Sequence, residues 1–62
     1  MPLIRREILF LIKDHPECTF DFIYRHFLTK KLSTIHYHLL KLQKEGKIQK
    51  LGNTRGVVYV TI

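Results

Sequence analysis

The spacing of apolar residues predicts that the chain begins with a helix. Pro2 suits the first position of a helix, where its missing N–H needs no partner. His15 and Pro16 end this helix, because a residue before proline avoids the helical conformation. One stripe of four residues at helical intervals is expected to be buried: Ile4, Ile8, Leu11 and Ile12.

A second helix is expected after Thr19, whose hydroxyl can cap a helix N-terminus. Asp21 lies in the first turn, where a negative charge is favourable. This helix should run to about Leu28 and be followed by a short polar turn. Its buried side is expected to be formed by Phe20, Ile23, Tyr24 and Phe27.

The third helix is predicted to span Ser33–Glu45. Ser33 is its expected N-cap, and Gly46 suits the left-handed position that follows a helix. The spacing i, i+4, i+7 places Ile35, Leu39 and Leu42 on the core side.

After Gly46 the pattern changes to that of strands. Residues 47–51 alternate, residues 52–56 are rich in turn formers, and residues 57–62 form a β-branched run. We therefore expect a hairpin with Arg55 at its tip. The fold class is α+β, mainly α, and 62 residues allow one domain, 1–62.

The charge is concentrated in the second part of the chain. Residues 1–21 carry three bases and four acids, whereas residues 22–62 carry eight bases and one acid. The net charge of +6 and a pI of about 9.8 indicate an anionic partner, either nucleic acid or an anionic membrane surface. Simple solubility is the alternative explanation.

The stretch "STIHYHLLKLQKEGKI", residues 33–48, resembles the recognition helix of winged helix-turn-helix proteins, especially ArsR-like and archaeal regulators. A Ser/Thr pair and a β-branched residue open it, exposed polar residues follow, and Glu-Gly leads into a strand. The resemblance covers about residues 4–62. It implies a three-helix winged helix-turn-helix domain with a C-terminal β-hairpin wing.

This resemblance implies that the third helix enters the major groove of double-stranded DNA, where its N-terminal residues reach base edges. The implied base contacts are Thr34, His36 and Tyr37. The implied backbone contacts are Lys30, Lys31, Ser33, Lys41, Lys44 and Lys50, with Arg55 of the wing near the flanking groove.

Several of these residues, and the neighbouring His38, also have a purely structural interpretation. Tyr37 can pack on a neighbouring helix, and His38, beside the core side, can be a half-buried, hydrogen-bonded histidine. Lys41 and Lys44 can lie on an ordinary solvated face, and Arg55 can be merely exposed.

No metal, cofactor, small-molecule or catalytic motif is evident. His36 and His38 are two residues apart, so they do not form an i, i+4 ligand pair. Cys18 is the single cysteine, which excludes an internal disulfide and favours a reducing cytoplasm. No apolar run reaches the roughly 18 residues that span a bilayer. We therefore expect no enzymatic activity.

The sequence thus favours a small transcription regulator that binds specific double-stranded DNA sites. The alternatives are a protein-interaction winged helix and a non-specific nucleoid-associated protein. Leu3 and Phe10 lie off the apolar stripe of the first helix, which predicts a homodimer interface there. The alternative for Phe10 is packing under the C-terminal strand.

Overall fold

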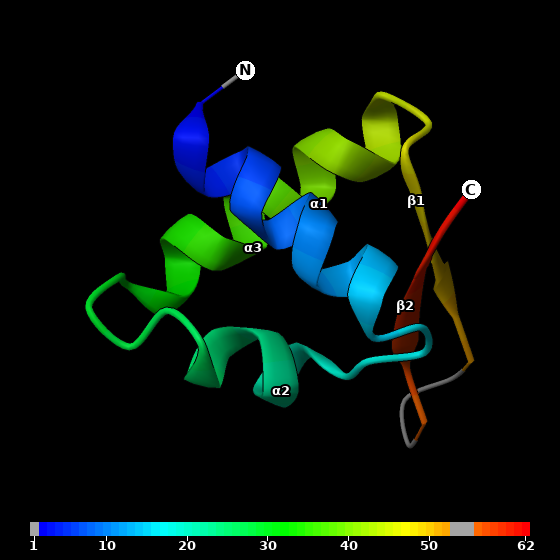
Figure 1. Cartoon of the computed structure of the whole chain (residues 1–62), viewed down its shortest axis with the longest axis horizontal. Coiled ribbons are helices and arrows are strands. Elements are labelled where there is room, and N and C mark those ends of the chain that lie inside the picture. Colours follow the sequence, from blue (N-terminus) through cyan, green and yellow to red (C-terminus); the bar gives the residue numbers. More distant parts are fainter. Residues whose placement is uncertain (1, 53–55) are drawn as a thin grey trace.

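A computed structural model describes residues 2–52 and 56–62 and shows three helices followed by an antiparallel hairpin (Figure 1). The helices are α1 (Leu3–Asp14), α2 (Phe20–Arg25) and α3 (Leu32–Lys44), and the strands are β1 (Ile48–Leu51) and β2 (Val58–Thr61). The predicted α+β, mainly helical class is confirmed, and the element order is winged-helix-like.

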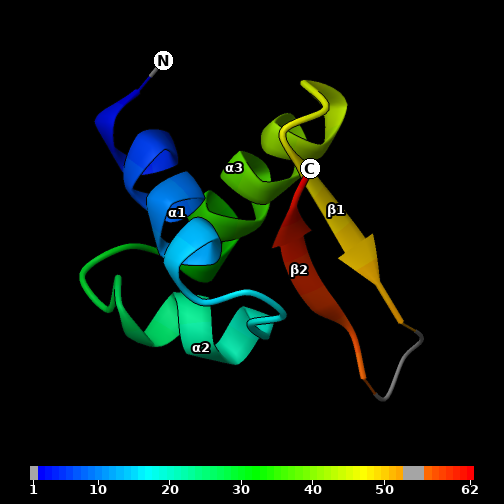
Figure 2. The same cartoon turned by 45° about the vertical axis from the view of Figure 1, so that its right-hand side comes forward.

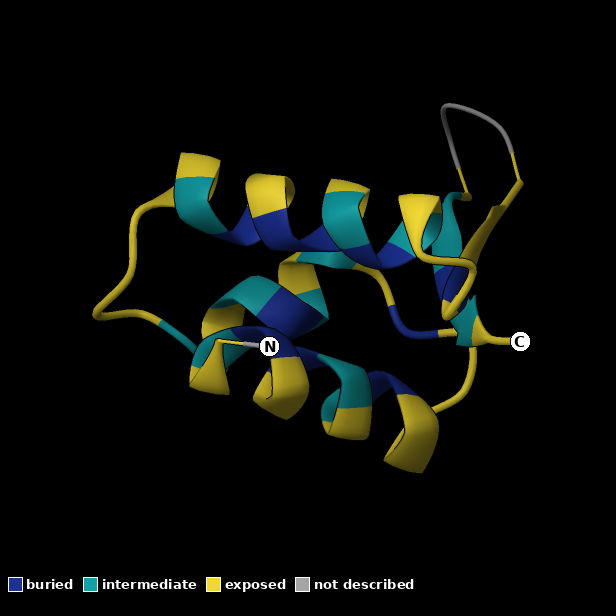
Figure 3. Cartoon of the chain, turned by 90° about the horizontal axis from the view of Figure 1, so that it is seen from above, coloured by how far each residue is buried: buried dark blue, intermediate teal, exposed yellow. Residues whose placement is uncertain are grey.

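The core forms where α1 contacts α2, α3 and β2. Figure 3 shows the buried positions of α1 and α3 on the sides that face one another. The predicted core residues of α3 are all buried, whereas Ile4 and Leu11 of the α1 stripe are only partly buried. The buried cluster comprises Ile8, Ile12, Cys18, Ile23, Ile35, Leu39, Leu42, Ile48 and Tyr59.

The second helix is shorter than the sequence predicts, because it does not continue to Leu28. The helix stops at Arg25, because the amides of His26 and Phe27 bond to carbonyls three residues back, in a tighter turn. The His26 side chain also bonds to the carbonyl of Phe22, at 2.9 Å. At the start of α2 the prediction is confirmed, since the Thr19 hydroxyl accepts a hydrogen bond from the Phe22 amide.

Ser33 is not the N-cap of α3, which corrects the prediction. Lys31 is the capping residue in an extended conformation, Leu32 is the first helical residue, and Ser33 is the second. A serine near a helix start marks the first turn but does not fix the cap position to within one or two residues.

The opposite end of α3 matches the prediction and fixes the exit into the hairpin. Gly46 has a φ of 73°, and its amide bonds to the carbonyl of Gln43 while the Lys47 amide bonds to that of Leu42. This pair of bonds is the Schellman arrangement, in which glycine is favoured because it has no Cβ.

The hairpin projects from one side of the helices, as Figure 2 shows. Its register pairs Ile48 with Thr61 and Leu51 with Val58, so both strands are slightly shorter than predicted. The loop before α2 adds a bridge that the sequence did not predict: the Tyr59 amide donates to the Cys18 carbonyl at 2.8 Å. This bridge joins β2 to the loop between α1 and α2.

Candidate nucleic-acid interface

The outward side of α3 brings together most of the residues predicted to contact DNA. Ser33, His36, Tyr37 and Lys44 are exposed, and Thr34 is partly buried. The helix sequence contains no aspartate or glutamate. This surface, which we call the α3 face, therefore combines hydroxyl, imidazole, phenol and ammonium groups without a carboxylate of its own.

The ring of His36 is held by a stack that extends from α2. Phe20 lies against it with ring centroids 4.1 Å apart and planes at 14°, and Tyr24 stacks beyond Phe20 at 6.2 Å. Stacking restricts the plane of the imidazole, while the residue as a whole stays exposed. Among the described residues no side chain or backbone group hydrogen-bonds to this imidazole, so its nitrogens are free to meet a ligand.

Two cationic side chains lie near the ring of Tyr37. The Arg5 guanidinium carbon is 5.8 Å from the centre of the Tyr37 ring, and the Lys41 amine is 5.7 Å from it. These are cation–π distances, and the ring is still 51% exposed. Tyr37 thus lies near Arg5 of α1 but is not buried against that helix, and its predicted base contact stays a prediction.

Arg5 also joins α1 to the buried side of α3. Its Nε donates a hydrogen bond to Nδ1 of His38 at 3.1 Å, and its Nη1 lies 3.3 Å from Oε2 of Glu45. Because arginine only donates, Nδ1 of His38 accepts and the imidazole is neutral, with its proton on Nε2. His38 is therefore a hydrogen-bonded histidine, as its structural interpretation expects, but it is buried and not half-buried, and the sequence did not reveal its partner.

This environment keeps His38 neutral. Burial lowers the pKa of His38 below its usual 6.5, and the positive charge of Arg5 lowers that pKa further. A protonated His38 would also lose the ability to accept from Arg5. The α1–α3 contact consequently depends on an uncharged imidazole.

The lysines predicted to contact the backbone lie just before α3, on α3 itself and on β1. Lys30 and Lys31 are exposed just before α3, Lys41 is partly buried, and Lys50 is exposed on β1. In the described part of the chain none of these four amines lies within ion-pair distance of a carboxylate. Arg55, the predicted wing contact, lies outside the described residues.

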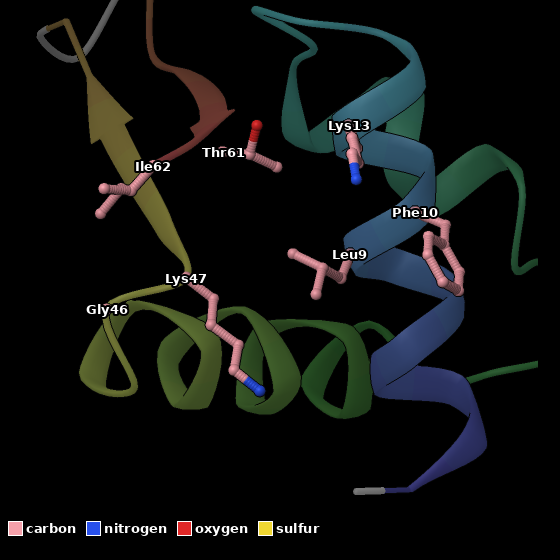
Figure 4. Close-up of a pocket in the computed structure, with 7 residues that line it drawn as sticks. All are labelled: Leu9, Phe10, Lys13, Gly46, Lys47, Thr61 and Ile62. Carbon is pink, nitrogen blue, oxygen red and sulfur yellow. The ribbon is translucent and has the colours of Figure 1, made fainter.

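The residues predicted to form a dimer interface lie on the other side of the molecule. Leu3 is 67% exposed and Phe10 is 54% exposed, so Phe10 is not part of the core. Phe10 lines a groove of about 310 Å³ between α1 and the C-terminal end of β2 (Figure 4). The residues lining this groove are Leu9, Phe10, Lys13, Gly46, Lys47, Thr61 and Ile62.

The described residues offer little support for other kinds of site. Within residues 2–52 and 56–62, no three His, Cys, Asp or Glu side chains are placed to hold a metal ion. No helix in this part of the chain is long and apolar enough to cross a membrane. Burial raises the pKa of the Cys18 thiol, which disfavours the reactive thiolate.

Sequence reasoning missed Arg5, Glu45, Phe20 and Leu40 as parts of this region. Arg5 did carry a signal, because it precedes Ile8 and Ile12 by three and seven residues and so lies on the buried stripe. Its partner could not be found without the packing of α1 on α3. Leu40 is also exposed on the outward side of α3.

Comparisons with protein-family models, with curated proteins and with solved structures find no match to this chain. The winged-helix likeness therefore rests on topology, three helices followed by an antiparallel hairpin.

Proposed function

We propose that this protein binds double-stranded DNA at specific sites, with α3 in the major groove, and acts as a small transcription regulator. The observation that carries the proposal is the α3 face: exposed hydrogen-bonding side chains on a helix without carboxylates, with lysines on the helix and just before it. A helix fits the major groove, and side chains near its N-terminus reach base edges there.

Within this proposal the side chains have different tasks. His36, Tyr37 and Thr34 contact bases, and the stack on Phe20 supports this role by limiting the orientations of the His36 ring. Lys30, Lys31, Ser33, Lys41, Lys44 and Lys50 contact the phosphate backbone, and Arg55 of the wing contacts the flanking groove.

A homodimer through α1 is part of the proposal. One helix contacts only a few base pairs, and two-fold pairing of half-sites about one helical turn apart is the common way to gain specificity. The exposure of Leu3 and Phe10 supports α1 as the contact surface, and Phe10 also lines an open groove.

The proposal is tested by selecting duplexes from a random pool with the full chain and comparing a selected duplex with its scrambled version. One well-made base contact gives about 1–3 kcal/mol, so we expect at least about fivefold tighter binding to the selected duplex. About four to six phosphate contacts per monomer predict a slope of about −4 to −5 for log K against log salt.

The outcomes separate this function from its alternatives. Equal affinity for selected and scrambled duplexes with a steep salt slope indicates non-specific coating of DNA. Absence of salt-dependent binding to any duplex contradicts the proposal and favours a protein-interaction module.

A further inference from the structure

Leu40 is an exposed apolar residue on the outward side of α3, among the polar and basic residues of the α3 face. It is 56% exposed and follows Ser33, His36 and Tyr37 at intervals of seven, four and three residues. These intervals place the four side chains on one side of a helix. Leu40 lies nearly opposite the buried Leu42 side, so it adds nothing to the core of the monomer.

Isolated exposed leucines are common and need no explanation. Here the surroundings matter, because Lys41 follows Leu40 directly and Lys44 lies one turn further along the same side. The nearest carboxylate along the chain is that of Glu45, which is engaged by Arg5 at 3.3 Å and by Lys47 at 3.8 Å. A complementary partner thus presents negative charge around a small apolar group.

The major groove of DNA has this combination of properties. Phosphates form its walls, and the 5-methyl group of thymine is an apolar group on a floor that otherwise offers hydrogen-bond donors and acceptors. An aliphatic side chain on a helix in the groove can cover this methyl group and remove it from water.

We propose that Leu40 contacts a thymine 5-methyl group and makes the protein select sites with thymine at that position. This inference rests on the proposed function and names the base that one further side chain recognises. Leu40 is about 4.5 Å further along the helix axis than Tyr37, close to the 3.4 Å spacing of base pairs. The thymine therefore lies one or two base pairs from the base that Tyr37 contacts.

The test uses the full chain and a duplex selected from a random pool, in which each thymine in turn is replaced by deoxyuridine. This replacement removes only the methyl group and leaves the hydrogen-bonding edge of the base unchanged. Burial of one such group predicts about fourfold weaker binding at one thymine, with no effect at most others.

The same duplexes are then measured with Leu40→Ala and with Leu28→Ala as a matched control. Leu28 is also an exposed leucine, but it lies in the turn after α2. We expect Leu40→Ala to bind the thymine duplex more weakly and to lose sensitivity to deoxyuridine, whereas Leu28→Ala keeps the fourfold difference.

Specific DNA binding without any methyl effect, or a methyl effect that persists in Leu40→Ala, overturns this inference and leaves the proposed function intact. Failure to bind any duplex overturns the proposed function and this inference with it. Because the change is made in the DNA, the main comparison does not depend on the stability of a variant.

Discussion

Replacing Arg5 by methionine is expected to lower the free energy of unfolding by about 1–3 kcal/mol at pH 7.5. The change keeps an apolar stem but removes the donor to His38, which is 7% exposed. A buried acceptor left without its partner costs about 1–3 kcal/mol. Loss of the ion pair with the more exposed Glu45 lowers the free energy of unfolding further, by about 0–1 kcal/mol. This loss is offset because the variant no longer buries a guanidinium.

The same variant should change how stability depends on pH. In the native protein the pKa of His38 is below 6.5, so under acid conditions the unfolded chain takes up a proton that the folded chain does not. The free energy of unfolding therefore falls as pH drops below 6.5, by up to about 1.4 kcal/mol per pH unit, until the folded pKa is reached. Without Arg5 one of the two causes of the low pKa is absent, so the decline is shallower.

The assay is urea unfolding at pH 7.5, 6.5 and 5.5, followed by circular dichroism. Arg6→Met is the matched control, because Arg6 is the exposed neighbour on α1 and its loss should change stability by less than about 0.5 kcal/mol. The difference between the native protein and Arg5→Met should narrow as pH falls. A constant difference at all three pH values, or an Arg5→Met protein as stable as the native one, would refute the role of the Arg5–His38 contact.

Three further predictions concern the proposed interfaces and the start of α2. Tyr37→Ala and His36→Ala should each reduce discrimination between selected and scrambled duplexes by about 1–3 kcal/mol, whereas Lys44→Ala should weaken binding to both duplexes alike. Anisotropy titrations in which all three variants show the same pattern would contradict this division. Phe10→Glu should convert a dimer into a folded monomer in analytical ultracentrifugation, and a native protein that is monomeric both at high concentration and on DNA would reject the interface. Thr19→Ala should lower the free energy of unfolding by about 1 kcal/mol in urea titrations, and an unchanged value would show that the hydroxyl does not cap α2.

The sequence predicted the elements of this fold because its signals are local. Thr19, Gly46 and the Ile35-Leu39-Leu42 spacing act within one helix or one turn, and the structure confirms all three. The errors at Ser33 and at the end of α2 are also local, since a cap signal or an apolar pattern fixes a boundary only to within a few residues. The hairpin followed from the change of period after Gly46.

The contacts that arrange the α3 face could not be predicted in this way. Arg5 and His38 are 33 residues apart, and Phe20 stacks on a histidine 16 residues further along the chain. Such pairs depend on how the helices cross, and no pattern within a single helix encodes that. A polar residue on a buried stripe, as Arg5 is, marks where a long-range partner should be sought.

The central claim is that α3 is the surface that binds DNA, and an amide-resolved NMR titration of the full chain with a selected duplex tests it most directly. We predict saturable shifts concentrated in residues 30–44. Around Phe10 and Lys13, on the groove side of α1, the changes should be small with a single half-site and larger only when a duplex with two half-sites brings two copies together through α1. Shifts confined to the groove side while α3 is unchanged, or no saturable shift with any duplex, would contradict the account.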